Sequence, residues 1–123
     1  MKEILCFGDS NTYGLIPGTK ERYGRDTRWT GLLEQHLYEK GYRIIEEGLC
    51  GRTTVFEDEL REGRKGVALL PTLLESHAPI DRVVLMLGTN DCKSLYNASA
   101  EVIGLGIEQL LKQIRKIDSD TRI

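Results

Sequence analysis

The stretch ILCFGDSN at residues 4–11 decides the fold of this chain. Its first four residues form an apolar run without polar alternation, which is typical of a strand that is covered on both faces. Gly8 ends this run, and a polar, glycine-containing stretch continues to Arg28. We therefore predict a buried strand over residues 4–7 that ends in a sharp turn.

Helical and extended patterns alternate along the rest of the chain. We expect helices over residues 29–40, 67–78 and 99–117, and strands over residues 43–46, 82–87 and 121–123. Such alternation predicts right-handed βαβ units, and hence a three-layer α/β/α sandwich with a parallel sheet of flavodoxin-like order. Covering both sheet faces needs at least one more strand and helix, so we expect the C-terminal part of the fold to be missing.

The composition is that of one ordinary globular domain over residues 1–123, with 40% hydrophobic and 29% charged residues. A net charge of -2 gives no basic face for nucleic acid or a membrane surface. Cys6, Cys50 and Cys92 lack CxxC spacing, so we predict reduced thiols, no disulfide framework and no metal site. No signal-peptide pattern opens the sequence, which predicts a cytoplasmic protein.

Three glycine-led segments follow the three predicted strands: Gly8–Asn11, Gly48–Thr53 and Gly88–Asp91. The ligand site of an open parallel α/β sheet lies at the carboxyl ends of its strands. Glycine also allows sharp turns and close approach of a ligand to the backbone N–H groups. We therefore expect these three segments to converge on one site.

The converging residues suit acyl transfer, which needs a nucleophile and hydrogen-bond donors for the oxyanion that develops. Ser10 is the predicted nucleophile, and its own N–H is one donor. The backbone N–H of Gly51 and the side-chain amide of Asn90 are the second and third donors. We assign Asp9 and Asp91 supporting roles, because carboxylates of this kind hold loops by accepting backbone N–H bonds.

Tyr13 and Trp29 are near the first segment, and either aromatic residue is as consistent with lining an acyl pocket as with packing in the core. The mixed-charge residues between Arg22 and Arg28 could bind an anionic substrate, but a solvated or subunit-contact surface is the favoured interpretation. Gly104 and Gly106 lie inside a predicted helix and indicate close packing of that helix on the sheet.

The three segments also resemble the GDSL, or SGNH, hydrolase family, whose members place Ser, Gly and Asn in three such blocks. Gly8-Asp9-Ser10 matches the first block, Gly51 the second and Gly88-Thr89-Asn90-Asp91 the third. More narrowly, the stretches 4–14, 46–54 and 86–91 are similar to the arylesterase and acyltransferase branch. The resemblance covers the whole chain and implies the SGNH hydrolase fold.

That resemblance implies hydrolysis of small carboxylic esters through an acyl-Ser10 intermediate, with acyl transfer to alcohols as a related outcome and no metal or organic cofactor. The family's fourth block, an Asp-x-x-His that supplies the base, does not occur in this sequence. Neither His36 nor His77 has an aspartate three residues before it. We interpret His36 as a packed or surface residue and His77 as an ordinary helix C-terminal histidine.

Two alternatives stay open. The chain could be a non-catalytic remnant or binding module that keeps the crevice but lacks the base. A flavodoxin-like nucleotide or phosphate binder is less well supported, because the first loop lacks GxGxxG and a P-loop lysine.

The strand at 83–87 would also have an incompletely protected neighbour, so we expect self-association into a homo-oligomer.

Overall fold

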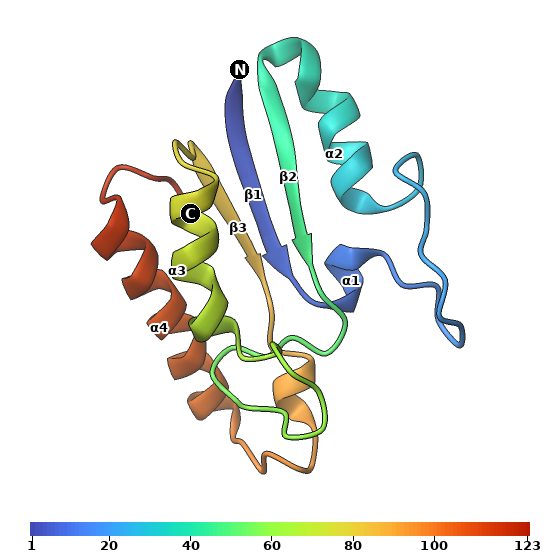
Figure 1. Cartoon of the computed structure of the whole chain (residues 1–123), viewed down its shortest axis with the longest axis vertical. Coiled ribbons are helices and arrows are strands. Elements are labelled where there is room, and N and C mark those ends of the chain that lie inside the picture. The colour runs from blue at the N-terminus through green and yellow to red at the C-terminus, as the bar shows by residue number, and fades with distance from the viewer.

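The computed structural model describes all 123 residues and contains one parallel sheet (Figure 1). Strands β1 (Lys2–Gly8), β2 (Tyr42–Gly48) and β3 (Arg82–Met86) lie in the order β2-β1-β3. The central strand β1 pairs in parallel with both neighbours, so that Leu5 lies opposite Ile45 and Val83. The parallel sheet that the sequence predicts is confirmed.

A fourth strand begins beside β3. Arg122 forms a parallel bridge with Arg82, and the Val83 N–H donates to the Arg122 carbonyl at 2.8 Å. This contact confirms that strand pairing begins near the end of the chain, and it places Arg122 on the outer edge of β3 in the flavodoxin-like order. Self-association through the rest of this edge stays a prediction.

Helices cover both faces of the sheet, which confirms the α/β/α layering. The helical elements are α1 (Ser10–Tyr13), α2 (Trp29–Leu37), α3 (Gly66–Ser76) and α4 (Ala100–Ile117), with 3₁₀ turns η1 (Tyr38–Lys40) and η2 (Asn90–Cys92). Side chains from α3 and α4 bury Leu5 and Phe7 of β1, whereas α2 packs on Ile4 and Cys6 from the other side. Alternate residues of β1 therefore point into two separate cores, as expected for a strand covered on both faces.

The expected helix ends are largely confirmed. Gly41 follows η1 with a φ of 90°, the left-handed conformation that a glycine adopts readily. Ser99 caps α4, and its side chain accepts the Val102 N–H at 3.2 Å. The short helix α1, which begins at Ser10, was not expected as a separate element.

Pro71 lies inside α3, where its ring nitrogen cannot donate to the carbonyl four residues earlier. That carbonyl belongs to Val67, and the Gln113 side chain of α4 donates to it at 2.7 Å. The neighbouring helix thus supplies the hydrogen bond that the proline removes. This is why a proline is accommodated within α3.

The two glycines of α4 differ from each other, which corrects the expectation that both pack on the sheet. A Cβ on Gly106 would lie 2.1 Å from the Thr54 hydroxyl oxygen, in the loop after β2. A Cβ on Gly104 would meet no atom within 4 Å. Only Gly106 marks a close approach, and the partner is a loop at the carboxyl end of the sheet.

Candidate active site

The three strands end level with one another, so the loops that follow them leave the sheet at one edge (Figure 1). Gly8 pairs with Gly48 of β2 and with Met86 of β3. This register brings the three predicted segments to the same edge, which is where an open parallel sheet binds its ligands.

Glycines let α1 sit directly on the strand ends. A Cβ on Gly8 would lie 2.1 Å from the Thr12 hydroxyl oxygen, and a Cβ on Gly48 would lie 2.2 Å from the Tyr13 nitrogen. Contacts this short exclude any side chain at either position. The helix that begins at Ser10 is therefore pressed onto the ends of β1 and β2.

Asp9 fixes the turn from which Ser10 projects. It is the N-cap of α1, it is almost fully buried, and its carboxylate accepts the Asn11 N–H at 3.0 Å. Ser10 itself is half-buried, and its hydroxyl has no hydrogen-bond partner within the chain. Ser10, Asn11 and Trp29 border a hollow of about 440 Å³.

Gly51 follows β2 in the left-handed conformation, with a φ of 84°. Its N–H has no backbone partner within the chain. Both groups that we expect to act at the reacting carbonyl, the Ser10 hydroxyl and the Gly51 N–H, are thus free of internal hydrogen bonds.

Arg52 is a site residue that the sequence did not reveal. Its guanidinium is buried, donates to the carbonyls of Gly8 at 3.2 Å and Glu47 at 2.5 Å, and lies 4.1 Å from the centre of the Phe7 ring. Burial lowers the pKa of Arg52 to about 10, although Glu47 opposes this effect. No pattern indicated it, because an arginine in a polar loop normally lies in water.

Asn90 connects the third segment to the second. Its side-chain amide donates one N–H to the Arg52 carbonyl at 3.0 Å, which leaves the other N–H for a ligand. A chain of hydrogen bonds therefore runs from Asn90 through Arg52 to Gly8, and joins the ends of all three strands.

Asp91 anchors the same turn from its other side. It is fully buried, and its carboxylate accepts the Thr54 N–H at 3.1 Å and the Thr54 hydroxyl. Because Gly106 of α4 packs on that threonine, α4 lies directly against the contact between Asp91 and Thr54. The catalytic and supporting roles of these residues stay predictions.

The profile of the GDSL-like lipase/acylhydrolase family matches residues 6–123. The chain belongs to this family. An aryl esterase of M. smegmatis is 42% identical with a TM-score of 0.89, and Est24, a carbohydrate acetylesterase from Sinorhizobium meliloti, gives the same two values. Each comparison covers 93% of this chain and 54% of the other.

A more distant likeness is AlinE4, an SGNH-hydrolase family esterase, at 25% identity and a TM-score of 0.67 over 95% of this chain and 55% of that one. The SGNH hydrolase fold expected from the sequence is thereby confirmed. The chain spans about half the length of these solved structures. A search of curated proteins finds no match.

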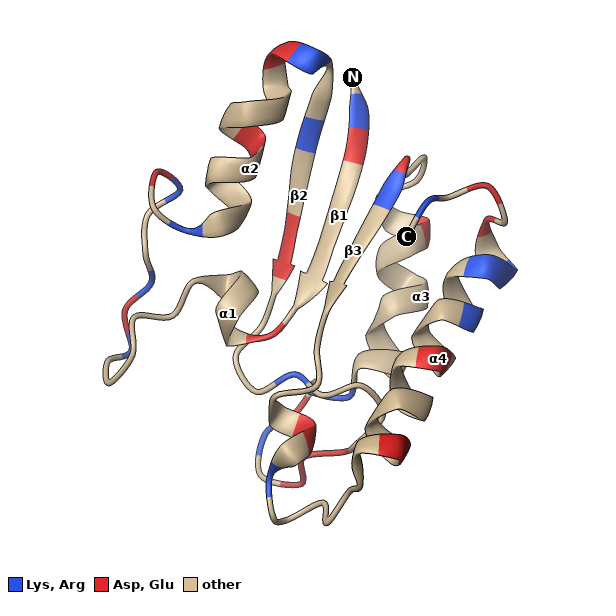
Figure 2. Cartoon of the chain, turned by 180° about the vertical axis from the view of Figure 1, so that it is seen from behind, with Lys and Arg blue, Asp and Glu red and all other residues tan.

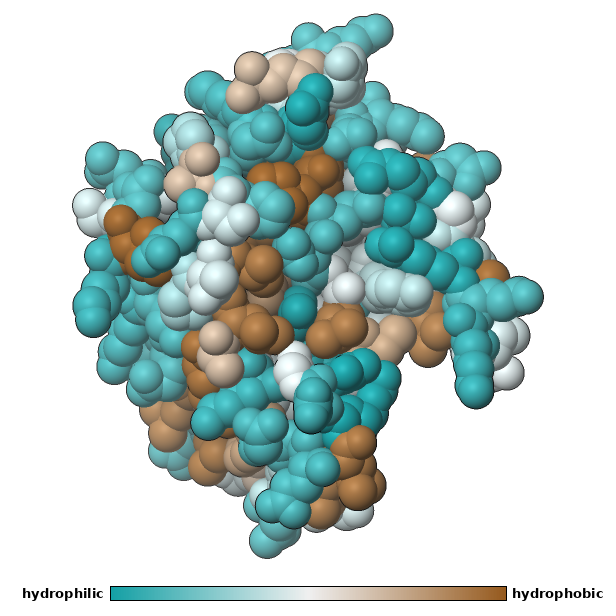
Figure 3. Space-filling view, in the orientation of Figure 1, coloured by the Kyte–Doolittle hydropathy of each residue, from teal (hydrophilic) through white to brown (hydrophobic).

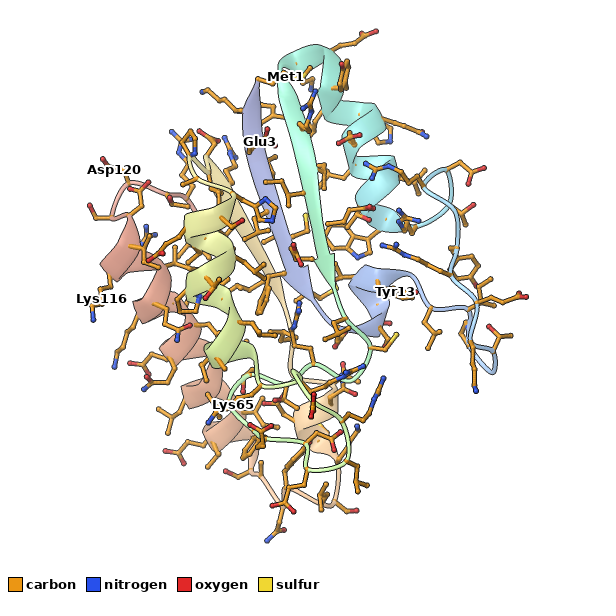
Figure 4. All side chains as sticks on the ribbon, viewed as in Figure 1. Met1, Glu3, Tyr13, Lys65, Lys116 and Asp120 are labelled. Atoms are coloured by element: carbon orange, nitrogen blue, oxygen red, sulfur yellow. The ribbon has the colours of Figure 1, made fainter.

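In this GDSL-family chain, the two aromatic candidates lie in different hollows. Trp29 borders the hollow that contains Ser10, while Tyr13 of α1 borders a neighbouring hollow of about 460 Å³ beside Leu49 and Cys50 (Figure 4). Arg22 holds Tyr13 there, since its guanidinium donates to the Tyr13 carbonyl at 2.7 Å and lies 4.3 Å from the ring centre. The substrate-binding roles of both residues stay predictions.

The mixed-charge loop before α2 is occupied within the chain. Arg28 donates twice to the Glu46 carboxylate at 2.8 Å, and Arg25 donates once at the same distance. Thr30 adds a hydroxyl donor at 2.6 Å. These hydrogen bonds, that of Arg28 first, lower the pKa of Glu46 to about 2. The structural interpretation of this loop accounts for its arginines better than binding of an anionic substrate.

Neither histidine forms a hydrogen bond with Ser10. His36 is exposed on α2, and His77 caps α3, where its Nε2 lies 3.1 Å from the Glu47 carboxylate. Neither borders the hollow that Ser10 lines.

All three cysteines are free thiols, and burial raises the pKa of Cys6 to about 12. None of the helices has both the length and the hydrophobicity of a membrane-spanning segment.

Proposed function

We propose that this chain forms the nucleophile-bearing part of a serine ester hydrolase that acts on small carboxylic esters through an acyl-Ser10 intermediate. The observation that carries this proposal is the hydrogen-bond chain from Asn90 through Arg52 to Gly8. It ties together the three strand ends that bear the predicted nucleophile and oxyanion donors. Similarity to an aryl esterase and a carbohydrate acetylesterase supports the same reaction class.

In the first step the Ser10 hydroxyl attacks the ester carbonyl, and a base removes its proton. Negative charge develops on the carbonyl oxygen, where the N–H groups of Ser10 and Gly51 and the free amide N–H of Asn90 donate hydrogen bonds. Such donors act in the transition state rather than the ground state. Loss of one of them typically costs about 10²-fold to 10³-fold in turnover.

Collapse of the tetrahedral intermediate expels the alcohol and leaves the acyl group on Ser10. Water then releases the acid, or a second alcohol takes the acyl group, which gives acyl transfer. Trp29 borders the Ser10 hollow and provides an apolar wall on which an alcohol can compete with water. We propose no metal or organic cofactor for this sequence of steps.

The attack requires a base, and neither His36 nor His77 borders the Ser10 hollow. Experiments on this chain should therefore add imidazole as an external base. We expect imidazole to accelerate turnover of a short aryl acetate more with the wild-type chain than with Ser10→Ala. Mass spectrometry should locate an acetyl group on Ser10 after brief exposure, because the acyl-enzyme forms on that hydroxyl.

The controls separate an esterase from a binding module that keeps the crevice. Asn90→Leu should reduce the imidazole-dependent rate by about 10²-fold, as expected for a lost oxyanion donor. Ser94→Ala, in the loop after η2, should leave the rate unchanged. Equal rates with wild type and Ser10→Ala, together with no acetyl or fluorophosphonate adduct on Ser10, would instead support the non-catalytic module.

A further inference from the structure

All the charged residues that line the hollow beside Tyr13 are basic. Its volume is about 460 Å³, and it lies between the segment after α1 and the loop after β2. Figure 3 shows a notch in this part of the surface. The residues that line it are Tyr13, Leu15, Thr19, Lys20, Leu49, Cys50, Arg61 and Arg64. Three of them are cationic and none is acidic, although the chain as a whole has a net charge of -2.

The three cations have no carboxylate within ion-pair distance. The arginines before α2 differ in this respect, because Arg25 and Arg28 are both paired with Glu46. In Figure 2 basic and acidic positions both occur in the loops at the carboxyl end of the sheet, and the acidic residues 57–59 and 62 do not line this hollow. An unpaired cation at the rim of a hollow is available to an anion that enters it.

Two of these cations lie beside Gly51, and backbone carbonyls hold one of them, Arg64, in place. Arg64 donates its Nε to the Cys50 carbonyl at 3.1 Å and its Nη1 to the Glu62 carbonyl at 2.7 Å. Arg61 covers Gly51 so closely that a Cβ there would lie 2.6 Å from its Nη1. Both guanidiniums therefore lie beside Gly51, whose N–H is a predicted oxyanion donor, and that of Arg64 is held there by two hydrogen bonds.

The rest of the lining is suited to a short carbon chain. Leu15, Leu49 and the Tyr13 ring provide apolar walls, and Tyr13 itself is held by Arg22. Planar guanidiniums form paired hydrogen bonds with a carboxylate or phosphate group. The hollow thus combines an apolar wall with a cationic rim, beside the residue at which the ester carbonyl would be bound.

We propose that this hollow is a subsite for the anionic end of the substrate, so that the preferred esters bear a carboxylate or phosphate a few carbon atoms from the ester group. The inference rests on the proposed ester hydrolysis, because the hollow is assigned to the substrate only through its position beside Gly51, a predicted oxyanion donor. It adds a substrate class that the reaction type alone does not determine.

Binding of two matched probes to the wild-type chain tests this subsite without turnover. Monomethyl glutarate carries one carboxylate, and dimethyl glutarate is its neutral counterpart. Titrations followed by backbone amide NMR should show the anionic probe binding about tenfold more tightly, which corresponds to about 1.4 kcal/mol. Shifts should centre on residues 49–51 and 61–64. The preference should also weaken as salt is raised, because the rim is exposed.

Charge-removing variants assign the preference to this rim. Arg61→Gln with Arg64→Gln should bind both probes with equal affinity. Arg43→Gln with Lys116→Gln removes the same charge at exposed positions outside the hollow and should keep the tenfold preference. Because Arg64 also supports the loop, Arg61→Gln alone provides a milder variant, with an expected loss of about threefold.

Equal affinity of the wild type for both probes would overturn the subsite, as would a preference that survives in the Arg61 and Arg64 double variant. The Ser10→Ala variant separates this result from the proposed function. If Ser10→Ala retains the preference while no acyl-Ser10 forms in the wild type, the subsite stands and the ester hydrolysis fails. If Ser10 is acetylated but the probes bind equally, the hydrolysis stands and the subsite fails.

Discussion

Replacing Glu46 by glutamine tests how the loop before α2 is held on the sheet. The Glu46 carboxylate accepts hydrogen bonds from Arg28, Arg25 and Thr30, and its side chain is only 10% exposed. Its pKa is lowered from an ordinary 4.5 to about 2. Each pKa unit corresponds to about 1.4 kcal/mol, so the ionised carboxylate contributes about 3 kcal/mol to the free energy of unfolding at neutral pH.

The pH dependence follows from the direction of this shift. A carboxyl group whose pKa is lowered by folding stabilises the protein at pH values above its unfolded pKa. That contribution is present above about 4.5 and is lost as the pH falls toward 2. Protonated Glu46 resembles glutamine in charge, so the stability difference between wild type and Glu46→Gln should shrink across this window.

Urea unfolding followed by circular dichroism at a series of pH values between 7 and 3 measures this difference. Glu46→Gln should reduce the free energy of unfolding by about 2 to 3 kcal/mol at pH 7. Glu39→Gln, at an exposed position without a partner in the chain, should change it by less than about 0.5 kcal/mol. A Glu46→Gln difference that stays constant from pH 7 to pH 3 would refute the assigned role of the carboxylate.

Two pairs of substitutions test the packing behind the site. Gly106→Ala should destabilise the chain by about 1 to 3 kcal/mol, because its Cβ would lie 2.1 Å from a threonine hydroxyl oxygen, whereas Gly104→Ala, which faces open space, should stabilise α4 by up to about 1 kcal/mol. Thermal unfolding of both variants distinguishes them, and shifts of the same sign would contradict the close approach. Gln113→Ala should cost about 1 to 2 kcal/mol by leaving the Val67 carbonyl unpaired, and less in a Pro71→Ala background, where a backbone N–H is restored. A double-mutant cycle measures that coupling, and strict additivity would argue against it.

The fold was largely predictable because hydrophobic pattern and turn residues agree along the chain. Apolar runs gave the three strands, and the residues at 99 and 41 gave helix ends that the structure confirms. The helix α1 was missed because a single turn of four residues has no apolar periodicity to detect. Gly106 was predicted to pack on the sheet, but it contacts the loop after β2. A sequence does not show which neighbour a helical glycine approaches.

The site was predictable to the extent that it depends on strand ends. Parallel strands of equal reach place the residues that follow them at one edge, so Ser10, Gly51 and Asn90 could be named from position and chemistry alone. The sequence does not predict in the same way that the basic residues around Tyr13 lie close together. Lys20 and Arg64 belong to loops separated by a helix and a strand, and only the folded chain brings them to one hollow.

The burial and hydrogen bonds of Arg52 could not be predicted from the sequence. Both of its hydrogen-bond acceptors are main-chain carbonyls, which every residue possesses, so no side-chain pattern marks them. Its Nε has no partner, and a buried cation is costly unless neighbouring groups compensate. The Phe7 ring and the carbonyls of Gly8 and Glu47 provide that compensation. Burial lowers the pKa of Arg52 to about 10, but the Glu47 carboxylate opposes this shift and the pKa stays well above neutral pH. Arg52 is therefore charged at neutral pH. A fixed positive charge bonded to the Gly8 carbonyl also favours negative charge at the adjoining turn, which is where the proposed reaction develops its oxyanion.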